Sequence, residues 1–349
     1  MKLNPGEYHC HDGQLELQSS RHFTKESLDH ADSLMNLIAG NTEQADPFCC
    51  RTEWQFSFHE AFSPHRDLYF RNSDDSSIIA FASYEHPNVG SILEPIESNW
   101  SFGCPLLGAG SVELLASLLQ EDHFCHVQPF ILLSGLIFGS TLLMNVLTTF
   151  KRRYEIIRLE PSITRCASLA GNMDGYLSRR SAKFRRNIRQ AALQSAGKGV
   201  FFERCRPISI EQADEAYARM LAVEEASWKG VGQCGMTVQP SRDFYWLMLR
   251  RLSLSGRGRV IFAKKDSRDI GFIFGGITGQ YYRGQQFSYA EDWSRYSVGS
   301  LLQMEKLRWM CEEGIARYDL GQAIDYKVRW AELELRTENL LLRPRKPGR

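Results

Sequence analysis

The stretch SRYSVGSLLQMEKLRWM, residues 294–310, places an arginine and several small residues directly ahead of an amphipathic helix. The first backbone N–H groups of a helix have no partners within it, and the helix dipole adds partial positive charge there. Gly299 and Ser300 leave room for a phosphate to approach these groups, and Arg295 is placed to pair with it. The same small residues also suit ordinary helix capping. The pattern therefore predicts a pyrophosphate cradle, made of Arg295, Ser297, Val298, Gly299 and Ser300.

A second stretch, YLSRRSAKFRRNIRQAAL at 176–193, has the spacing of a helix with one apolar and one basic face. Residues 179–206 contain nine basic residues and one acid, Glu203. Charges of one sign repel each other on a helix unless an anion lies nearby. We therefore predict a face that binds an anion, and the alternative is a solvated surface helix. The residues expected to bind are Arg179, Lys183 and Arg186.

Charge is distributed unevenly along the 349 residues. Residues 1–150 contain 6 Lys+Arg and 19 Asp+Glu, whereas residues 151–349 contain 36 and 22. All nine histidines lie within the first 126 residues. An acidic half joined to a basic half indicates either a second part that meets an anion or two halves that complement each other.

Nine cysteines with scattered spacing and no C-x-x-C pattern indicate reduced thiols. The N-terminus lacks the apolar core of a secretory signal, so we expect a cytoplasmic protein. The clusters HCH at 9–11 and HFCH at 123–126 have no second half at zinc-site spacing. No metal site is therefore predicted.

Residues 127–150 carry no charge, and their length allows a membrane span. Pro129, Gly135 and Gly139 interrupt the segment, however. A strand over 130–137 followed by a turn and a helix over 140–153 is the better interpretation, and no membrane span is predicted.

The chain around the cradle has the order β-β-β-α-β. The expected elements are strands 259–265, 270–278 and 281–290, helix 299–313 and strand 315–321. The first half repeats this pattern with strands 67–72, 77–84 and 91–96, helix 111–120 and strand 130–137. An α/β (α+β) fold of two similar domains is therefore predicted, with a junction near 161–176. The expected ranges are an acidic domain 1–165, a basic domain 166–342 that carries the cradle, which the resemblance described next makes the acyl-donor site, and a basic disordered tail 343–349.

The β-β-β-α-β order with this cradle resembles the GNAT acyltransferase fold, whose cradle reads Q/R-x-x-G-x-G/A. Residues 176–330 more specifically resemble the CelD-type group of GNAT proteins, named after a cellulose-biosynthesis protein and related to Fem-type transferases. The matching segments are LSRRSAKFRRNIRQA at 177–191, EEASWKGVG at 224–232, YAEDWSRYSVGSLL at 289–302 and YDLGQAIDYKVRWA at 318–331. Ala290 departs from the usual Asp, and Val298 departs from the Pro of the cradle. The resemblance implies two tandem GNAT-like domains, each with a mixed, mostly antiparallel sheet flanked by helices.

The resemblance also implies an N-acyltransferase that moves an acyl group from acyl-CoA, as a co-substrate, to an amine-bearing acceptor. It implies no permanently bound cofactor. Because no histidine lies in residues 151–349, the base must be a carboxylate, a tyrosine or a relayed water. Asp292 or Glu291 is the expected base, and Tyr289 the expected acid for the leaving thiolate. The alternative is that both carboxylates are solvated turn residues.

Further site residues follow from the matched segments. Lys327 is expected to contact a phosphate or carboxylate, and Asp319 either contacts substrate or orients Lys327. Trp228 and Lys229 are expected to line the acceptor site. Two other functions stay open: a Fem-like transferase that takes its acyl group from aminoacyl-tRNA, and a non-catalytic binding protein on the same fold.

Overall fold

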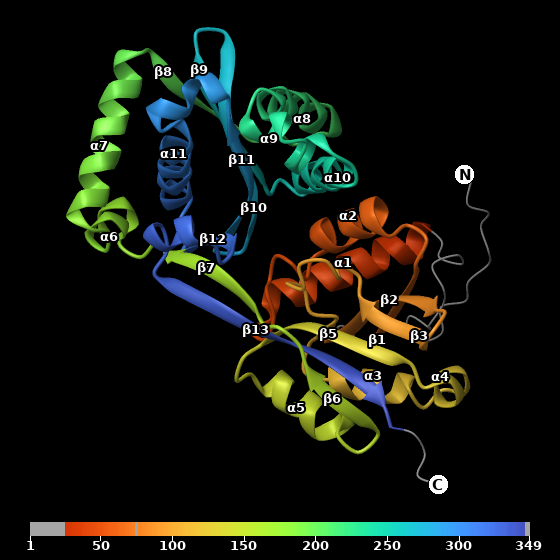
Figure 1. Ribbon diagram of the computed structural model, residues 1–349. Coiled ribbons are helices and arrows are strands. Elements are labelled where there is room, and N and C mark those ends of the chain that lie inside the picture. The colour runs from red at the N-terminus through yellow and green to blue at the C-terminus, as the bar shows by residue number, and fades with distance from the viewer. Residues whose placement is uncertain (1–24, 74–75, 346–349) are drawn as a thin grey trace. The chain divides into compact units, whose positions relative to one another are not determined.

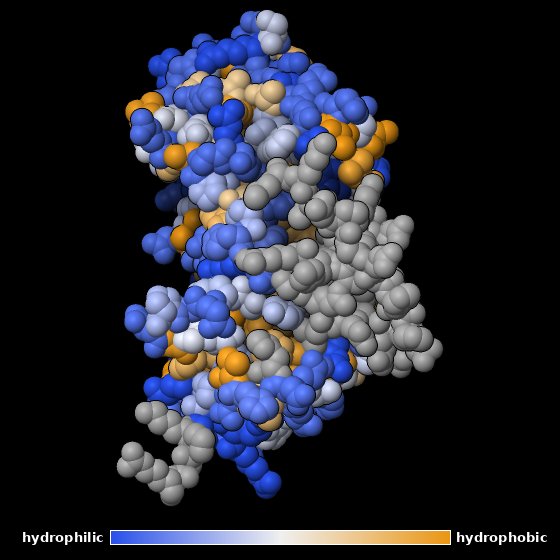
Figure 2. All heavy atoms as spheres, turned by 90° about the vertical axis from the view of Figure 1, so that its right-hand side faces the viewer, coloured by the Kyte–Doolittle hydropathy of each residue, from blue (hydrophilic) through white to orange (hydrophobic). Residues whose placement is uncertain are grey.

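The computed structural model describes residues 25–73 and 76–345. The chain divides into two compact units. Unit 1 comprises residues 1–162 and 336–349, and unit 2 comprises residues 163–335. Apolar side chains from helices and strands form a separate core in each unit. The face drawn in Figure 2 is accordingly mostly hydrophilic, with small apolar patches.

Unit 1 is a mostly antiparallel sheet between helices (Figure 1). Its sheet has the order β1-β2-β3-β5-β13, with β4 beside β2 and β6 beside β13. The helices α1 and α2 cover one face, and α3 and α5 cover the other. The elements are α1 (Lys25–Asn41), α2 (Thr52–Phe62), β1 (Asp67–Ser73), β2 (Ser77–His86), β3 (Gly90–Pro95), β4 (Leu106–Leu107), α3 (Ser111–Leu118), α4 (Asp122–Val127), β5 (Phe130–Ile137), α5 (Thr141–Phe150), β6 (Tyr154–Arg158) and β13 (Leu333–Pro344).

Unit 2 follows the same plan, with the strand order β7-β12-β11-β10-β9-β8. The helix α11 packs on one face beside α6 and α7, whereas α8 and α10 cover the other (Figure 1). The elements are β7 (Ser162–Ser168), α6 (Asn172–Ser178), α7 (Ala182–Gly197), β8 (Val200–Cys205), α8 (Ile210–Glu225), α9 (Trp228–Val231), η2 (Gly235–Thr237), α10 (Ser241–Leu254), β9 (Gly258–Lys265), β10 (Arg268–Thr278), β11 (Tyr281–Tyr289), η3 (Glu291–Tyr296), α11 (Val298–Glu312), β12 (Arg317–Gln322) and η4 (Asp325–Arg329).

The predicted β-β-β-α-β order is present in both units. Each unit has a parallel pair, β3 with β5 and β11 with β12, joined through the helix α3 or α11. A parallel pair needs such a crossover because the chain must return to the end of the sheet where the first strand began before the next strand can start. The predicted fold class, mixed α/β with mostly antiparallel strands flanked by helices, is confirmed.

Two predictions about boundaries need correction. Residues 336–342 belong to unit 1, although the sequence placed them in the second domain. The reason is that β13 pairs with β5 and β6 and buries Leu340 and Leu342 in the core of unit 1. The predicted disordered tail also overlaps this strand, because β13 continues to Pro344. Residues 346–349 of that tail lie outside the described residues.

The sequence predicted a single helix for the basic stretch 176–193. The stretch instead contains the end of α6 and most of α7. Ser181 separates them in an extended conformation, and its Oγ accepts the backbone N–H of Phe184 at 3.1 Å. This N-cap bond satisfies an N–H group that the new helix leaves open. The helix therefore restarts at Ala182, which changes the direction of the basic face.

The uncharged segment 127–150 forms β5 and α5, as predicted. Within the described ranges, no helix is long and apolar enough to cross a membrane. The eight cysteines found there are all free thiols. No cluster of three metal-ligating side chains occurs among the described residues. The HCH cluster at 9–11 lies outside them.

Candidate functional site

The strands β11 and β12 pair over only three residues each and then separate. Their register ends at Arg283 opposite Asp319, while β11 continues to Tyr289. A cavity of about 350 Å³ opens where the pairing stops. Its lining comes from both strands, from α9, from α11 and from η4: Trp228, Lys229, Ile273, Gly284, Gln285, Gln286, Phe287, Ser288, Tyr289, Gln303, Tyr318, Leu320, Ile324, Tyr326 and Lys327. We call it the strand cavity.

A buried ion pair lies where the two strands separate. Asp319 Oδ2 accepts a hydrogen bond from Arg283 at 2.7 Å, and its Oδ1 accepts the backbone N–H of Gly321 at 2.7 Å. Gly321 has a φ of +80°, a backbone conformation that favours glycine. Asp319 does not line the strand cavity. Its observed contacts therefore support the strand separation, and none of them supports the predicted substrate contact.

Lys327 lies on η4 and lines the strand cavity. Its Nζ donates a hydrogen bond to the carbonyl oxygen of Gln322 at 2.9 Å. Burial and the nearby Arg283 lower the pKa of this amine to about 8, whereas Asp319 opposes the shift. The predicted site residue is thus an amine that titrates close to neutral pH.

Lys229 enters the strand cavity from α9. Its Nζ donates to Gln286 Oε1 and to the carbonyl oxygen of Phe287, both at 2.9 Å, and lies 3.6 Å from the buried carboxylate of Glu224. Burial lowers the pKa of Lys229, and Glu224 opposes this shift. The neighbouring Trp228 is 57% exposed and forms part of the cavity wall, and its predicted contact with an acceptor stays a prediction.

The glycine of the SWKG segment has a packing role. A Cβ atom added at Gly230 would lie 2.3 Å from the carbonyl oxygen of Glu225. Only glycine therefore allows α9 to approach the end of α8 this closely. This approach places Trp228 and Lys229 at the cavity.

A second cavity, of about 300 Å³, lies at the N-terminus of α11. We call it the cradle cavity. Ser297 precedes the helix with a φ of 56° and makes no side-chain capping bond. Two cations, Lys183 from α7 and Arg329 from η4, line the cavity with Ser297 and Ser300. The complete lining is Ser181, Lys183, Phe184, Asn187, Ile188, Ala191, Ser297, Ser300, Arg329 and Trp330.

The three other cradle positions differ from the prediction. Val298 is fully buried in the core of unit 2. A Cβ atom at Gly299 would lie 2.9 Å from Cε1 of Tyr289 and 3.1 Å from Cε2 of Phe287. Gly299 is therefore required by the aromatic rings of β11, whereas the prediction attributed it to an approaching phosphate. Arg295 is exposed, lies over the Tyr296 ring at 5.0 Å, and lines neither cavity.

The expected catalytic carboxylates are in η3, outside both cavities. Asp292 forms a two-bond ion pair with Arg268, at 2.8 and 3.3 Å, on the surface. Glu291 is exposed. Their contacts fit the alternative of solvated turn residues. Tyr289 does line the strand cavity, and Ala290 is buried next to it.

The basic residues of α6 and α7 fall into two groups. Arg179 donates to Glu332 and to the carbonyl oxygens of Ala170 and Ser168, at 3.1, 3.1 and 2.7 Å. These bonds hold the region before α7 in place, so Arg179 has a structural role where substrate binding was predicted. Lys183 and Arg186 are exposed on α7, and Lys183 reaches the cradle cavity.

Sequence reasoning missed several residues of the site. Ser288 Oγ and Gln285 Nε2 are buried without a hydrogen-bond partner in the described residues, and both residues line the strand cavity. A buried polar group without a partner is costly, so a ligand with complementary groups would satisfy them. Arg329 and Tyr326 were also missed. They lie in the matched YDLGQAIDYKVRWA segment, and this match is the signal that could have identified them.

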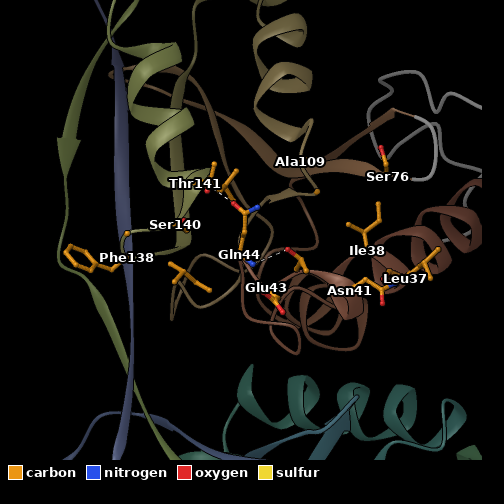
Figure 3. A pocket seen from close by; sticks show the side chains of 15 residues that line it. Leu37, Ile38, Asn41, Glu43, Gln44, Ser76, Ala109, Phe138, Ser140 and Thr141 are labelled. Atoms are coloured by element: carbon orange, nitrogen blue, oxygen red, sulfur yellow. Dashed lines mark hydrogen bonds between the residues drawn. The ribbon is translucent and has the colours of Figure 1, made fainter.

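A further cavity, of about 850 Å³, is in unit 1 and was not predicted. Figure 3 shows it between the end of α1, the loop before α3 and the start of α5. Gln44 Oε1 accepts the backbone N–H of Leu142 at 2.7 Å, and Ser140 caps the same helix. Glu43 is the only ionisable residue among its described lining residues. This cavity therefore offers little acid–base chemistry.

Comparisons with known proteins agree with this geometry. Residues 179–328 match the family model of the acetyltransferase (GNAT) domain. No curated protein sequence matches the chain. The predicted GNAT-like fold is thereby confirmed, and the matched residues all lie within unit 2.

Three solved structures resemble most of the chain. A conserved protein of unknown function from Bacteroides thetaiotaomicron VPI-5482 has a TM-score of 0.63 at 11% identity, over 90% of this chain and 97% of that one. FemX gives 0.59 at 10% identity, over 93% and 97%. The C-terminal domain of a putative lysylphosphatidylglycerol synthetase from Agrobacterium fabrum gives 0.57 at 12%, over 90% and 92%. At these identities the likeness concerns the fold alone.

Proposed function

We propose that this protein is an N-acyltransferase that moves an acyl group from acyl-CoA to an amine. The thioester arm of the donor enters the strand cavity, and its phosphates bind in the cradle cavity. One observation carries the proposal: the uncapped N-terminus of α11, with Lys183 and Arg329 beside it, adjoins the place where β11 and β12 separate. Both cavities share η4, through Lys327 in one and Arg329 in the other.

The chemistry of each cavity suits its part of the donor. Helix N–H groups and two cations bind the negative charge of a diphosphate. The strand cavity provides an aromatic and aliphatic wall together with the unpartnered Ser288 Oγ and Gln285 Nε2. These donors can hold amide oxygens of the arm or the oxyanion that forms when the amine attacks. Fixing both ends of the donor sets the thioester carbonyl beside the acceptor, which accelerates transfer by positioning.

Acetyl-CoA should raise the melting temperature of the protein. A ligand present at 100 times its dissociation constant adds about 2.7 kcal/mol to the free energy of unfolding. The site is tested by Ser300→Asp, which places a negative charge in the cradle cavity, with Ser300→Ala as its matched control. Ser300→Asp should bind acetyl-CoA at least ~10-fold more weakly, and Ser300→Ala should bind within ~3-fold of the wild type.

Two outcomes would contradict the proposal. A melting temperature that is unchanged by acetyl-CoA and by longer acyl-CoA esters at millimolar concentration rejects acyl-CoA as the donor. Wild-type affinity in a folded Ser300→Asp protein instead rejects the placement of the donor phosphates.

A second candidate function is a Fem-like transferase that uses aminoacyl-tRNA. The exposed basic residues of α7, Lys183, Arg186 and Arg189, favour it, because such a face suits a nucleic-acid backbone. The similarity to FemX concerns the fold alone and agrees with this candidate as well. Retention of aminoacyl-tRNA on a filter, without a response to acyl-CoA, is the result that selects it.

The finer assignments belong to the same proposal. The segments with the WKG and YDLGQAIDYKVRW patterns support placing the chain in the CelD-type group. The free cysteines of the described residues support a cytoplasmic location.

The absence of any carboxylate among the residues lining the strand cavity favours a third candidate, a non-catalytic binding protein. An acyltransferase requires that another residue of this cavity serves as the base.

A further inference from the structure

The strand cavity contains few groups that can accept a proton. Its described lining has no Asp, Glu or His, and its titratable residues are Lys229, Lys327, Tyr289, Tyr318 and Tyr326. An attacking amine must lose one proton when it becomes an amide. The proton must therefore pass to one of these five side chains or directly to water.

The tyrosines are unsuited to receive this proton. A phenol titrates near pH 10 in water and holds its proton at neutral pH. Burial raises the pKa of both Tyr318 and Tyr326 further. In addition, the Tyr318 hydroxyl already donates to Gln303 Oε1 at 2.5 Å. A neutral phenol at such a position can donate a proton but not accept one.

Lys229 has more acceptors around its amine than Lys327 has. Gln286 Oε1 and the carbonyl oxygen of Phe287 each accept a hydrogen bond from its Nζ, and the Glu224 carboxylate lies 3.6 Å away. These three oxygens equal in number the three donors of an ammonium group. Proton loss would weaken all three contacts and leave the buried Glu224 charge without its partner.

Lys327 has different surroundings. Within the described part of the chain its Nζ makes one hydrogen bond, to the carbonyl oxygen of Gln322. The adjacent carboxylate of Asp319 forms an ion pair with Arg283 at 2.7 Å, so the positive charge of Arg283 largely offsets its negative charge. On η4 itself, the Tyr326 ring centroid lies 5.9 Å from Nζ. A buried amine beside an arginine, with a single carbonyl acceptor, has a stable neutral form.

We propose that Lys327 is the general base of the acyl transfer, a role that rests on the proposed function. The acceptor amine attacks the thioester carbonyl, so that an N–C bond forms and the carbonyl oxygen becomes an oxyanion. The nitrogen then gives one proton to the neutral Nζ of Lys327. The C–S bond breaks as the carbonyl re-forms, and the departing thiolate takes the proton from the Lys327 ammonium. Protons balance, and Lys327 returns to its neutral form.

The first test compares Lys327→Arg with the wild type, because arginine keeps a positive charge but cannot lose its proton. Lys151→Gln, at an exposed lysine of unit 1, serves as the control for an altered surface charge. Release of the CoA thiol from acetyl-CoA is followed with a panel of primary amines between pH 6 and 10. Wild-type kcat/KM should rise with pH to a plateau above about pH 8. Lys327→Arg should lower kcat at least ~100-fold, keep KM for acetyl-CoA within ~3-fold, and lose the rise with pH.

A second measurement needs no substrate. The ¹³Cε chemical shift of lysine follows the charge of its amine, and the Lys327 signal is assigned by its loss in Lys327→Arg. The shift should change with a midpoint near pH 8. A midpoint above pH 10 for Lys327 overturns the assignment of the base.

The outcomes separate the two proposals. If the wild type releases thiol and folded Lys327→Arg retains both its rate and its pH profile, the general-base role is wrong and the acyltransferase stands. If the wild type neither binds acetyl-CoA nor releases thiol with any amine, the proposed function fails and the role of Lys327 as its base fails with it.

Discussion

At the scale of single residues, Gly299 shows how close packing limits the site. A side chain at this position meets the rings of Tyr289 and Phe287 at about 3 Å. Gly299→Val should therefore lower the free energy of unfolding by about 1–3 kcal/mol through overpacking. Acetyl-CoA affinity should fall as well, because the displaced rings line the strand cavity. Urea unfolding and calorimetric titration measure the two effects. A Gly299→Val protein as stable as the wild type would show that these rings can move aside without a cost in free energy.

Lys327 should leave a signature in the pH dependence of stability. Its pKa falls from an ordinary value of 10.5 to about 8 on folding, so the unfolded chain binds more protons than the folded one between these values. The stability of the wild type relative to Lys327→Met should therefore rise as pH increases from 8 to 10.5, by at most about 3 kcal/mol. Below pH 8 the amine of Lys327 is protonated in both the folded and the unfolded state. The difference in stability between the wild type and Lys327→Met should therefore be constant there.

This prediction is checked by urea unfolding of the wild type and Lys327→Met at pH 7.5 and pH 10. The comparison with the variant removes the contribution of other groups, such as the buried tyrosines, that titrate in the same range. A difference that is the same at both pH values would contradict a lowered pKa.

At the scale of elements, the basic segment around α7 should separate into a structural and a binding part. Arg179 anchors the chain before α7 through three hydrogen bonds, so Arg179→Gln should lower the free energy of unfolding by about 1–3 kcal/mol. Lys183→Gln should change stability by less than about 0.5 kcal/mol. It should weaken acetyl-CoA binding several-fold and reduce the salt dependence of that binding, because Lys183 reaches the cradle cavity.

Thermal unfolding and titration at 50 and 300 mM salt test this division. The result that rejects it is an unchanged stability for Arg179→Gln together with an unchanged salt dependence for Lys183→Gln. In that case α7 is a solvated surface helix without a part in donor binding.

At the scale of the whole molecule, the C-terminal strand should stabilise the N-terminal half of the chain. Residues 336–344 of β13 pair with β5 and β6, and Leu340 and Leu342 are fully buried in unit 1. Ending the chain after Leu335 should therefore destabilise unit 1 by several kcal/mol, since burying one leucine contributes about 1.5–3 kcal/mol. Limited proteolysis should then cut within residues 25–158 first. Cuts confined to unit 2 would contradict this dependence.

Much of the plan of both units could be predicted from the sequence. Alternating apolar residues and turn signals located the strands and helices of both β-β-β-α-β repeats, because these patterns depend on neighbouring residues. The break at Ser181 within the basic stretch was missed, although serine is a frequent N-cap, because the apolar spacing continued across it.

What the sequence by itself determined is therefore the order of elements, the GNAT-like fold class and the segments that contribute to the site. Tertiary structure alone decided which side chains share a cavity. Asp292 lies outside the cavity and forms an ion pair with Arg268. Gly299 leaves the space that the Tyr289 ring occupies. Tertiary structure also buried Lys327 beside Arg283. The physical reason is that local patterns depend on neighbours along the chain, whereas burial, charge pairing and pKa depend on neighbours in space.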